Sequence, residues 1–236
     1  STNDSIELLK KFINKAREYS SPKVHNFVNI KIFKNFWSTL TKGPHRDINT
    51  IYLDDKEKTQ IINDINEFIN GEEIYNMYGV PYKRTYLLEG IPGTGKTSLI
   101  FAIASMLDMD ISIINFGPDI DDTIFMGAVA SLHENSILLI EDVDALFLER
   151  QSSNKSAISF SGVLNTLDGV TRRNKLITFI TTNHIEKLDH ALIRPGRIDY
   201  ILEFGYTTKE QLSNMFNKFR PNDNFEEFYN KIEDLK

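Results

Sequence analysis

The sequence contains the loop Gly90-Ile91-Pro92-Gly93-Thr94-Gly95-Lys96-Thr97, which runs directly into Ser98. Two glycines separated by four residues and followed by Lys and Thr form the pattern of a phosphate-binding loop. The apolar run at 85–88 predicts a buried strand before the loop, and the run at 98–107 predicts a helix after it. Strand, glycine-rich loop and helix are the structural setting that this motif requires.

The residue types of this loop suit a chain of phosphates. Glycines allow the backbone N–H groups to turn inward around phosphate oxygens, and the N-terminus of the next helix adds partial positive charge. Lys96 can reach the terminal phosphates, and the Thr97 hydroxyl can hold Mg²⁺. The alternative, a glycine-rich turn with a chance Lys, is disfavoured because the motif and its flanking elements agree. We expect a nucleotide to contact the following residues: Gly90, Pro92, Gly93, Thr94, Gly95, Lys96, Thr97 and Ser98.

Composition and charge narrow the class of protein. The 236 residues suffice for one α/β domain and a smaller piece. The absence of cysteine excludes disulfides and thiolate metal sites. The net charge of −6 argues against non-specific nucleic-acid binding, although residues 1–50 carry nine Lys and Arg against four Asp and Glu. This basic front end could face a membrane or an acidic partner, or it could be an ordinary solvated surface.

Apolar segments that alternate with helical stretches predict the fold. Besides the segment at 85–88, strands are expected at residues 111–116, 137–140, 176–182 and 200–204. Strands that alternate with helices pair in parallel through right-handed crossovers, and continuous apolar runs suit strands covered on both faces. We therefore predict an α/β fold of the P-loop NTPase type, with a five-stranded parallel sheet and helices on both faces.

The segments that precede and follow these strands in the sequence have separate patterns. Before them, we expect a helix at about residues 4–19, a strand at 28–32, and a turn at Gly43-Pro44 that is a candidate domain boundary. Because one helix and one strand cannot form a core, residues 1–48 read as the end of an N-terminal domain. Behind the sheet, a helix is expected at 209–219. Its apolar residues are expected to point inward: Leu212, Met215, Phe216 and Phe219.

Polar residues follow two of the expected strands. Glu141-Asp142 ends the segment 137–140, and ligands bind at the carboxyl edge of such sheets. One acid can hold Mg²⁺ while the other orients and deprotonates water, and two solvated acids are a weaker explanation beside a phosphate loop. Asp144 fits helix capping or a subunit contact equally well. Asn183 can contact a γ-phosphate oxygen or the attacking water, or it can simply form a turn.

Two arginines flank a Pro-Gly step before the last expected strand, in Arg194-Pro195-Gly196-Arg197. A guanidinium matches phosphate geometry and can stabilise transition-state charge as an arginine finger. The residues alone slightly favour the alternative, salt bridges to Asp189 or Asp199. The five histidines lack the spacing of a metal pair, so packing or surface roles are expected for them.

With these residues in place, the segment from about 49 to 219 resembles the AAA-type ATPases of the AAA+ class. The phosphate loop, the acid-ended strand, Thr181-Thr182-Asn183 and the stretch from Leu188 to Asp199 occur in the family's order. Within the family, the chain is similar to the mitochondrial translocase of the Rieske iron–sulfur protein, a complex III assembly chaperone. Three stretches carry this narrower resemblance: Glu141 to Ala145, Ser161 to Val170, and Thr182-Asn183-His184 with Lys187-Leu188-Asp189.

The resemblance implies ATP and Mg²⁺ as ligands and assigns several roles. Asn183 becomes the γ-phosphate sensor. Arg194 and Arg197 become catalytic fingers that act on the ATP of a neighbouring subunit, which implies a homo-oligomeric ring of six or seven subunits. Thr97 and one strand-end acid hold the metal, and the other acid acts on water. General AAA proteins carry Asp then Glu at this strand exit, so the order Glu141 then Asp142 places Glu141 at the metal and Asp142 at the water, with the assignment left open.

The resemblance also divides the chain. Residues 49–205 become the ATPase core, and residues 206–236 become the beginning of a helical lid. Val80 is expected to line the adenine pocket. Phe125-Met126-Gly127 imitates the pore loop of threading AAA motors but lies only sixteen residues before Glu141. We therefore expect Phe125 and Met126 to be helix residues packed inward, and we expect no threading of unfolded polypeptide.

Together these expectations predict Mg²⁺-dependent ATP hydrolysis by a ring that translocates or remodels a protein substrate, including folded cargo. A clamp-loader or initiator ATPase acting on nucleic acid is the first alternative, which the acidic balance disfavours. A nucleotide-switched scaffold without hydrolysis is the second, which the strand-end acids and Asn183 disfavour. No apolar run approaches the ~20 residues of a membrane helix, so membrane attachment would need a segment outside this chain. The compartment stays open between the mitochondrial inner membrane and the cytoplasm.

Overall fold

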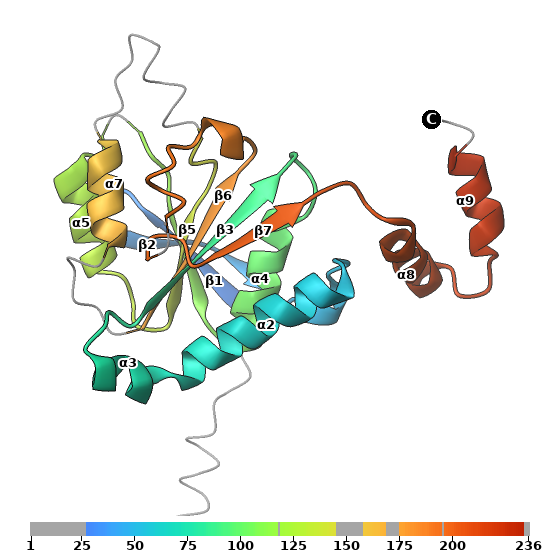
Figure 1. Ribbon diagram of the computed structural model, residues 1–236, viewed down its shortest axis with the longest axis horizontal. Coiled ribbons are helices and arrows are strands. Elements are labelled where there is room, and N and C mark those ends of the chain that lie inside the picture. The colour runs from blue at the N-terminus through green and yellow to red at the C-terminus, as the bar shows by residue number, and fades with distance from the viewer. Residues whose placement is uncertain (1–26, 118, 145–157, 169–174, 195, 234–236) are drawn as a thin grey trace, which may run out of the picture.

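The computed structural model describes residues 27–117, 119–144, 158–168, 175–194 and 196–233 (Figure 1). The helix expected at residues 4–19 lies outside the described residues. The strands are β1 (Phe27–Phe33), β2 (Trp37–Pro44), β3 (Lys83–Gly90), β4 (Asp110–Ile114), β5 (Ser136–Ile140), β6 (Leu176–Thr182) and β7 (Tyr200–Phe204). The helices are α2 (Asp55–Asn70), α3 (Glu72–Tyr78), α4 (Lys96–Leu107), α5 (Asp122–Ala130), α7 (Phe160–Leu167), α8 (Lys209–Phe219) and α9 (Phe225–Glu233), with short 3-10 turns η1 (Ile48–Thr50) and η3 (Ile185–Lys187).

One sheet organises the described chain, in the order β2-β1-β4-β5-β6-β3-β7. The five strands predicted from the sequence are confirmed, and β4, β5, β6, β3 and β7 pair in parallel. The predicted count of five is nevertheless wrong, because the sheet has seven strands. β1 adds to the open edge of β4 in parallel, and β2 folds back on β1 antiparallel.

The turn predicted at Gly43-Pro44 is also wrong. Both residues belong to the end of β2, where Gly43 pairs with Val28 and Pro44 with Phe27. Pro44 is the last residue of β2, the edge strand of the sheet, and prolines within sheets are confined to such edge strands. The local Gly-Pro signal was therefore a strand end rather than a turn.

Helices cover both faces of the sheet, α2 and α4 on one and α5 and α7 on the other (Figure 1). Each face has its own hydrophobic cluster. One contains Ile61 and Ile65 of α2 with Ile103 of α4, and the other contains Phe125 of α5 with Val163 of α7. Every residue of the central strand β5 is buried, as expected for a strand covered on both sides.

The expectation for the Phe125-Met126-Gly127 segment is half right. These residues lie within α5, and Phe125 is fully buried against Phe116, with ring centroids 5.4 Å apart. Met126 is 40% exposed, so its predicted inward packing is wrong. Successive helix residues point about 100° apart, and this places Met126 on the outer side of α5 when Phe125 faces the sheet.

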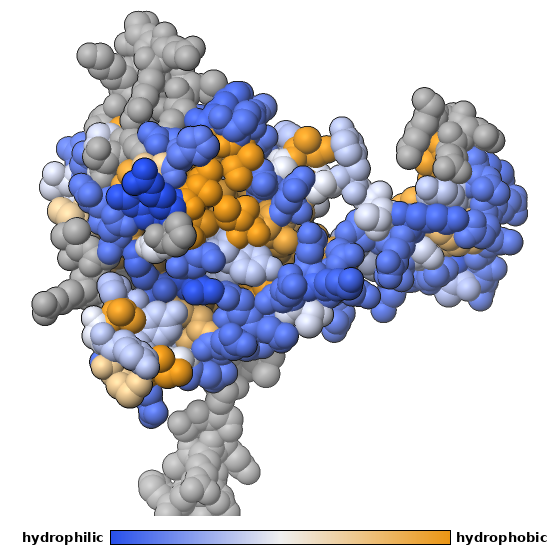
Figure 2. All heavy atoms as spheres, viewed as in Figure 1, coloured by the Kyte–Doolittle hydropathy of each residue, from blue (hydrophilic) through white to orange (hydrophobic). Residues whose placement is uncertain are grey.

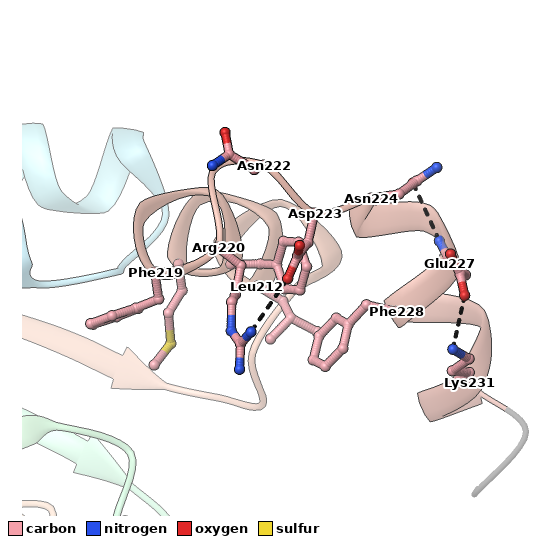
Figure 3. Close-up of a pocket in the computed structure, with 11 residues that line it drawn as sticks. Leu212, Phe219, Arg220, Asn222, Asp223, Asn224, Glu227, Phe228 and Lys231 are labelled. Atoms are coloured by element: carbon pink, nitrogen blue, oxygen red, sulfur yellow. Dashed lines mark hydrogen bonds and ion pairs between the residues drawn. The ribbon is translucent and has the colours of Figure 1, made fainter.

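The pair α8–α9 projects away from the sheet after β7 (Figure 1). The helix predicted at 209–219 is confirmed, but its predicted inward packing is wrong, because α8 has no buried residue. Met215 and Phe219 are 44% and 68% exposed. The apolar side of α8 faces α9 and an open cavity of about 650 Å³ between them instead of the sheet (Figure 3). Within the described ranges, no helix combines the length and apolar character needed to cross a membrane.

Candidate active site

The predicted strand, loop and helix are confirmed as β3, residues 91–95 and α4. Gly90, Gly93 and Gly95 all have positive φ angles, of 137°, 83° and 103°. A Cβ atom on Gly90 would stand 2.1 Å from the Phe204 carbonyl oxygen of β7. The loop therefore needs glycine at its start for two reasons, a backbone conformation that side chains disfavour and the close passage of the neighbouring strand.

Lys96 begins α4 and is only 7% exposed. Its Nζ donates to the carbonyl oxygens of Gly90 at 2.6 Å and Ile91 at 3.1 Å, and to Oδ1 of Asn183 at 2.8 Å. Burial lowers the pKa of Lys96, and the nearby carboxylates of Asp142 and Asp144 oppose this shift. The ammonium group is thus held at the mouth of the loop, where phosphate oxygens could replace the acceptors that the chain supplies.

Thr97 and Glu141 form an oxygen pair beside Lys96. The Thr97 hydroxyl donates to Oε1 of Glu141 at 3.1 Å. No cluster of three or more His, Cys, Asp or Glu side chains suited to a metal exists in the part of the chain that the structure describes. The pair still fits Mg²⁺, because this cation prefers hard oxygen ligands and takes only one or two from the protein, with waters and phosphates completing its shell.

Asp142 and Asn183 meet at the ends of the neighbouring strands β5 and β6. The Asn183 Nδ2 donates to Oδ1 of Asp142 at 3.0 Å, while Oδ1 of Asn183 receives the Lys96 ammonium. Asp142 has a positive φ of 46°, and its backbone N–H donates to the Thr181 hydroxyl at 3.0 Å. The structure therefore brings Lys96, Asn183 and both predicted acids to one edge of the sheet.

Asp144 has a structural role that the sequence reading did not include. It is 5% exposed, and its Oδ1 accepts from the Thr182 hydroxyl at 2.9 Å and from the Asn183 N–H at 3.2 Å. A buried carboxylate with two donors locks the turn after β6 onto the turn after β5. The sequence shows Asp144 as a third acid after one strand and Thr182-Asn183 at the end of another. The contact could have been predicted only by knowing that these two strands are neighbours in the sheet.

The two arginines have different surroundings. Arg197 donates from Nε to both carboxylate oxygens of Asp168 at 3.0 Å and from Nη2 to Oδ2 at 2.9 Å. Its Nη1 also donates to the Ala191 carbonyl at 2.8 Å. This hydrogen bonding with Asp168 raises the pKa of Arg197. The side chain of Arg194 is exposed and forms no hydrogen bond or ion pair with any other residue that the structure describes.

The predicted alternative partners of these arginines are occupied elsewhere. Asp189 accepts from the Ala191 N–H at 2.8 Å, and Asp199 accepts from the Thr85 N–H at 2.8 Å. The salt bridge that does form uses Asp168, at the end of α7. A bidentate pair of this kind fixes Arg197 more firmly than a single hydrogen bond would.

A pocket of about 580 Å³ extends from the phosphate loop between the start of α2 and the start of α8. Pro92, Gly93 and Thr94 line one side of it, and Tyr52 and residues 203–208 line others. The volume is in the range of small-molecule sites. Tyr52 was not singled out from the sequence, since an isolated Tyr before a helix cap has no pattern of its own.

Val80, expected beside adenine, is not brought to this pocket. It is 51% exposed and follows α3, three residues before β3 begins. The phosphate loop follows the other end of β3, so the strand, of eight residues at about 3.3 Å each, separates the two. Val80 is exposed, as are Ile74 and Met77 of the preceding helix α3. Figure 2 shows apolar residues at the surface in the region of α3.

Comparisons with known proteins agree with this geometry. The family described as "ATPase family associated with various cellular activities (AAA)" matches residues 86–206. The chain is 39% identical over 226 residues to the "Probable mitochondrial chaperone BCS1-B" of Dictyostelium discoideum, covering 81% of this chain and 49% of the relative. It is 38% identical over 185 residues to the human "Mitochondrial chaperone BCS1", covering 75% and 44%. The chain thus spans about half the length of these relatives or less.

Proposed function

Because this chain belongs to the AAA family of ATPases, we propose that it hydrolyses ATP with Mg²⁺ in a ring of six or seven copies and uses the energy to move or remodel a protein substrate. The observation that carries this proposal is the convergence of Lys96, the Thr97–Glu141 pair and the Asp142–Asn183 pair at one edge of the sheet. Cation, metal ligands and water-directing groups are the parts that phosphoryl transfer requires.

The residue roles follow from these contacts. Thr97 and Glu141 would hold Mg²⁺, which supplies positive charge to the phosphate oxygens when bound. Lys96, already desolvated, binds terminal phosphate oxygens as a point charge. Asp142 orients the attacking water and accepts its proton, and Asn183 links that carboxylate to the γ-phosphate. The 3.1 Å contact of Thr97 with Glu141 and the 3.0 Å contact of Asp142 with Asn183 support this division of the two acids.

The substrate and location rest on the relatives. Those named above are called mitochondrial chaperones, so we infer a protein substrate and a mitochondrial setting for this chain. Membrane attachment, if present, would come from a segment outside residues 1–236. We retain the proposed division into an N-terminal part (1–48), an ATPase core (49–205) and the start of a lid (206–236), in which β1 and β2 join the N-terminal part to the sheet of the core.

The test of hydrolysis is Lys96→Ala, measured as phosphate release from ATP. Loss of the buried ammonium should lower turnover by about 100-fold or more, in the range seen when one preorganised charge-stabilising group is removed. Lys42→Ala removes an exposed lysine from β2 and should leave turnover unchanged. Equal activity of Lys96→Ala and the unmodified protein would remove the proposed function.

The test of the ring uses the exposed Arg194. Arg194→Ala should bind ATP normally but hydrolyse it at least about tenfold more slowly, because an arginine finger acts on the transition state of a neighbour. Mixing it with Lys96→Ala subunits should restore part of the turnover, since such rings contain interfaces with one intact loop and one intact Arg194. If co-assembled mixtures, verified by two affinity tags, stay inactive, Arg194 does not act between subunits.

A further inference from the structure

The segment that follows β2 lies along one face of the helix that carries the phosphate-binding residues. Ser98, Phe101 and Ser105 of α4 are spaced by three and four residues, so they share this face. A Cβ on Gly43 would stand 3.2 Å from the Phe101 ring, which shows how closely the end of β2 approaches. Arg46 continues the contact, because its backbone N–H donates to the Ser105 hydroxyl at 3.0 Å.

The side chain of Arg46 reaches the other end of α4. Its Nη1 donates to the Ser98 hydroxyl at 3.1 Å, and its Nε donates to the Thr50 hydroxyl at 3.3 Å. Thr50 is itself fixed, since its hydroxyl donates to the Asp47 carbonyl at 2.7 Å in the capped turn η1. The guanidinium is therefore held between η1 on one side and the first turn of α4 on the other.

Ser98, which accepts the hydrogen bond from Arg46, lies beside the residues expected to bind phosphate and metal. Ser98 directly follows Thr97, whose hydroxyl contacts Glu141, and stands two residues after the buried Lys96. All three residues belong to the first turn of α4. Arg46 lies outside the segment that matches the family, residues 86–206.

We propose that Arg46 is a positioning residue of the nucleotide site, which holds the first turn of α4 through Ser98 and ties strands β1 and β2 to the bound nucleotide. The inference rests on the proposed function for its consequence in binding, but its structural part stands without it. Arginine suits the role because its planar group donates in two directions at once, toward Thr50 and Ser98, whereas the ammonium of Lys is a single point. Because linkage is reciprocal, nucleotide binding should in turn stabilise residues 43–50.

The first measurement is amide hydrogen exchange of the nucleotide-free protein in the first turn of α4, residues 96–100. The Leu99 N–H donates to the Gly95 carbonyl at 3.0 Å and reports on this turn. Arg46→Ala and Ser98→Ala should each speed exchange there by about 3–10-fold, as expected for the loss of one exposed hydrogen bond to a charged group. Unchanged exchange in Arg46→Ala would overturn the proposal, whatever the protein does with ATP.

The second measurement is the affinity for a fluorescent ATP analogue with Mg²⁺ in a double-mutant cycle. Arg46→Ala should weaken binding by about 3–10-fold in the unmodified protein and by less than about twofold in the Ser98→Ala background, because the shared contact is already lost. Arg46→Lys should restore part of the affinity, and Lys42→Ala should bind normally. Independent, multiplying effects of the two substitutions, or a falling thermal midpoint without any change in affinity, would show that Arg46 does not act through Ser98.

These two measurements separate failure of this inference from failure of the proposed function. If the unmodified protein binds no ATP, the proposed function is wrong, and the exchange of residues 96–100 still decides whether Arg46 holds the helix. If ATP binds and Lys96→Ala abolishes its hydrolysis while Arg46→Ala changes neither exchange nor affinity, only the inference about Arg46 is wrong.

Discussion

Helix α4 beside the sheet and helix α8 beyond it bury their apolar side chains to very different extents. In α4, Leu99, Ile100 and Ile103 have no exposed surface. In α8 no residue is buried. The pair α8–α9 is held by an aromatic cluster in which the Phe216 and Phe228 rings stack with centroids 4.7 Å apart. In Figure 3 Leu212 and Phe228 lie between the two helices, while Phe219 points away from α9.

The contrast shows which parts of the candidate site are positioned by packing within this chain. Lys96 and Thr97 stand at the start of α4, whose inner face is buried, and the strand-end acids follow the buried strand β5. Gln211, in the first turn of the loosely packed α8, and Thr208, which caps that helix, line the same pocket. The phosphate end of the pocket is thus preorganised by the core, and the α8 end depends on the short connection after β7.

The largest expected effect comes from truncating one apolar side chain in the core and one in the α8–α9 pair and comparing the losses of stability. Ile61→Ala in α2 should cost about 2–5 kcal/mol of unfolding free energy, because Ile61 is fully buried in the core cluster. Phe228→Ala removes more atoms but should cost less than about 1 kcal/mol, since an open cavity already adjoins its ring.

Urea unfolding followed by the fluorescence of Trp37 is the measurement. Trp37 is the only tryptophan of the chain. Its indole N–H donates a hydrogen bond to the Ala128 carbonyl of α5 at 3.0 Å, so its fluorescence reports on the core. A cost for Phe228→Ala as large as that for Ile61→Ala would mean that the α8–α9 pair is energetically part of the core. Faster hydrogen exchange confined to α8 and α9 in Phe228→Ala would sharpen the distinction.

A smaller expected effect is the pH dependence of ATP affinity, which tests the buried charge of Lys96 at the phosphate end of the pocket. Burial lowers the pKa of Lys96, so the free protein loses this proton at a lower pH than an ordinary lysine does. Phosphates stabilise the protonated form, so ATP binding takes up a proton above that pKa. Affinity should therefore fall several-fold as pH rises through this range, below the usual lysine value of about 10.4. Titration of affinity against pH measures it.

The control for this pH dependence is Lys96→Arg, whose guanidinium stays charged over the same range. Its affinity, although weaker, should not fall in the range where the unmodified protein loses affinity. An identical fall in both proteins would assign the pH dependence to a group other than Lys96.

The sequence allowed much of the fold and the phosphate end of the site to be predicted. The positions of β3, β5 and β6 followed from apolar runs, and Glu141 and Asn183 followed from polar residues at strand ends. Parallel strands place their carboxyl ends at one edge, so residues far apart in sequence could be expected together. The strand expected at 28–32 is present as β1, but its place in the sheet beside β4 was missed, because a strand pattern does not say which edge it joins. β2 was missed as a strand, because its Gly43-Pro44 end was interpreted as a turn.

Three other features could not be predicted for a related reason. Arg197 has several aspartates within reach in the sequence, and the choice of Asp168 depends on where α7 ends. Helix α8 is amphipathic, and this pattern is the same whether its apolar face packs on the sheet or on α9. The pattern therefore could not predict which of the two it contacts. The expectation for Val80 came from family resemblance, and the chain's own geometry places it at the opposite end of β3 from the loop.

By itself the sequence determined the local elements and the phosphate loop, because glycine spacing and hydrophobic period act through neighbours along the chain. Only the tertiary structure decided which charged and polar groups meet. Lys96 and Asn183 are 87 residues apart and Arg197 and Asp168 are 29 apart, and their partners are selected by the order of strands and the packing of helices. For the buried Lys96 the choice is enforced by burial, since a buried polar group left without a partner costs about 1–3 kcal/mol.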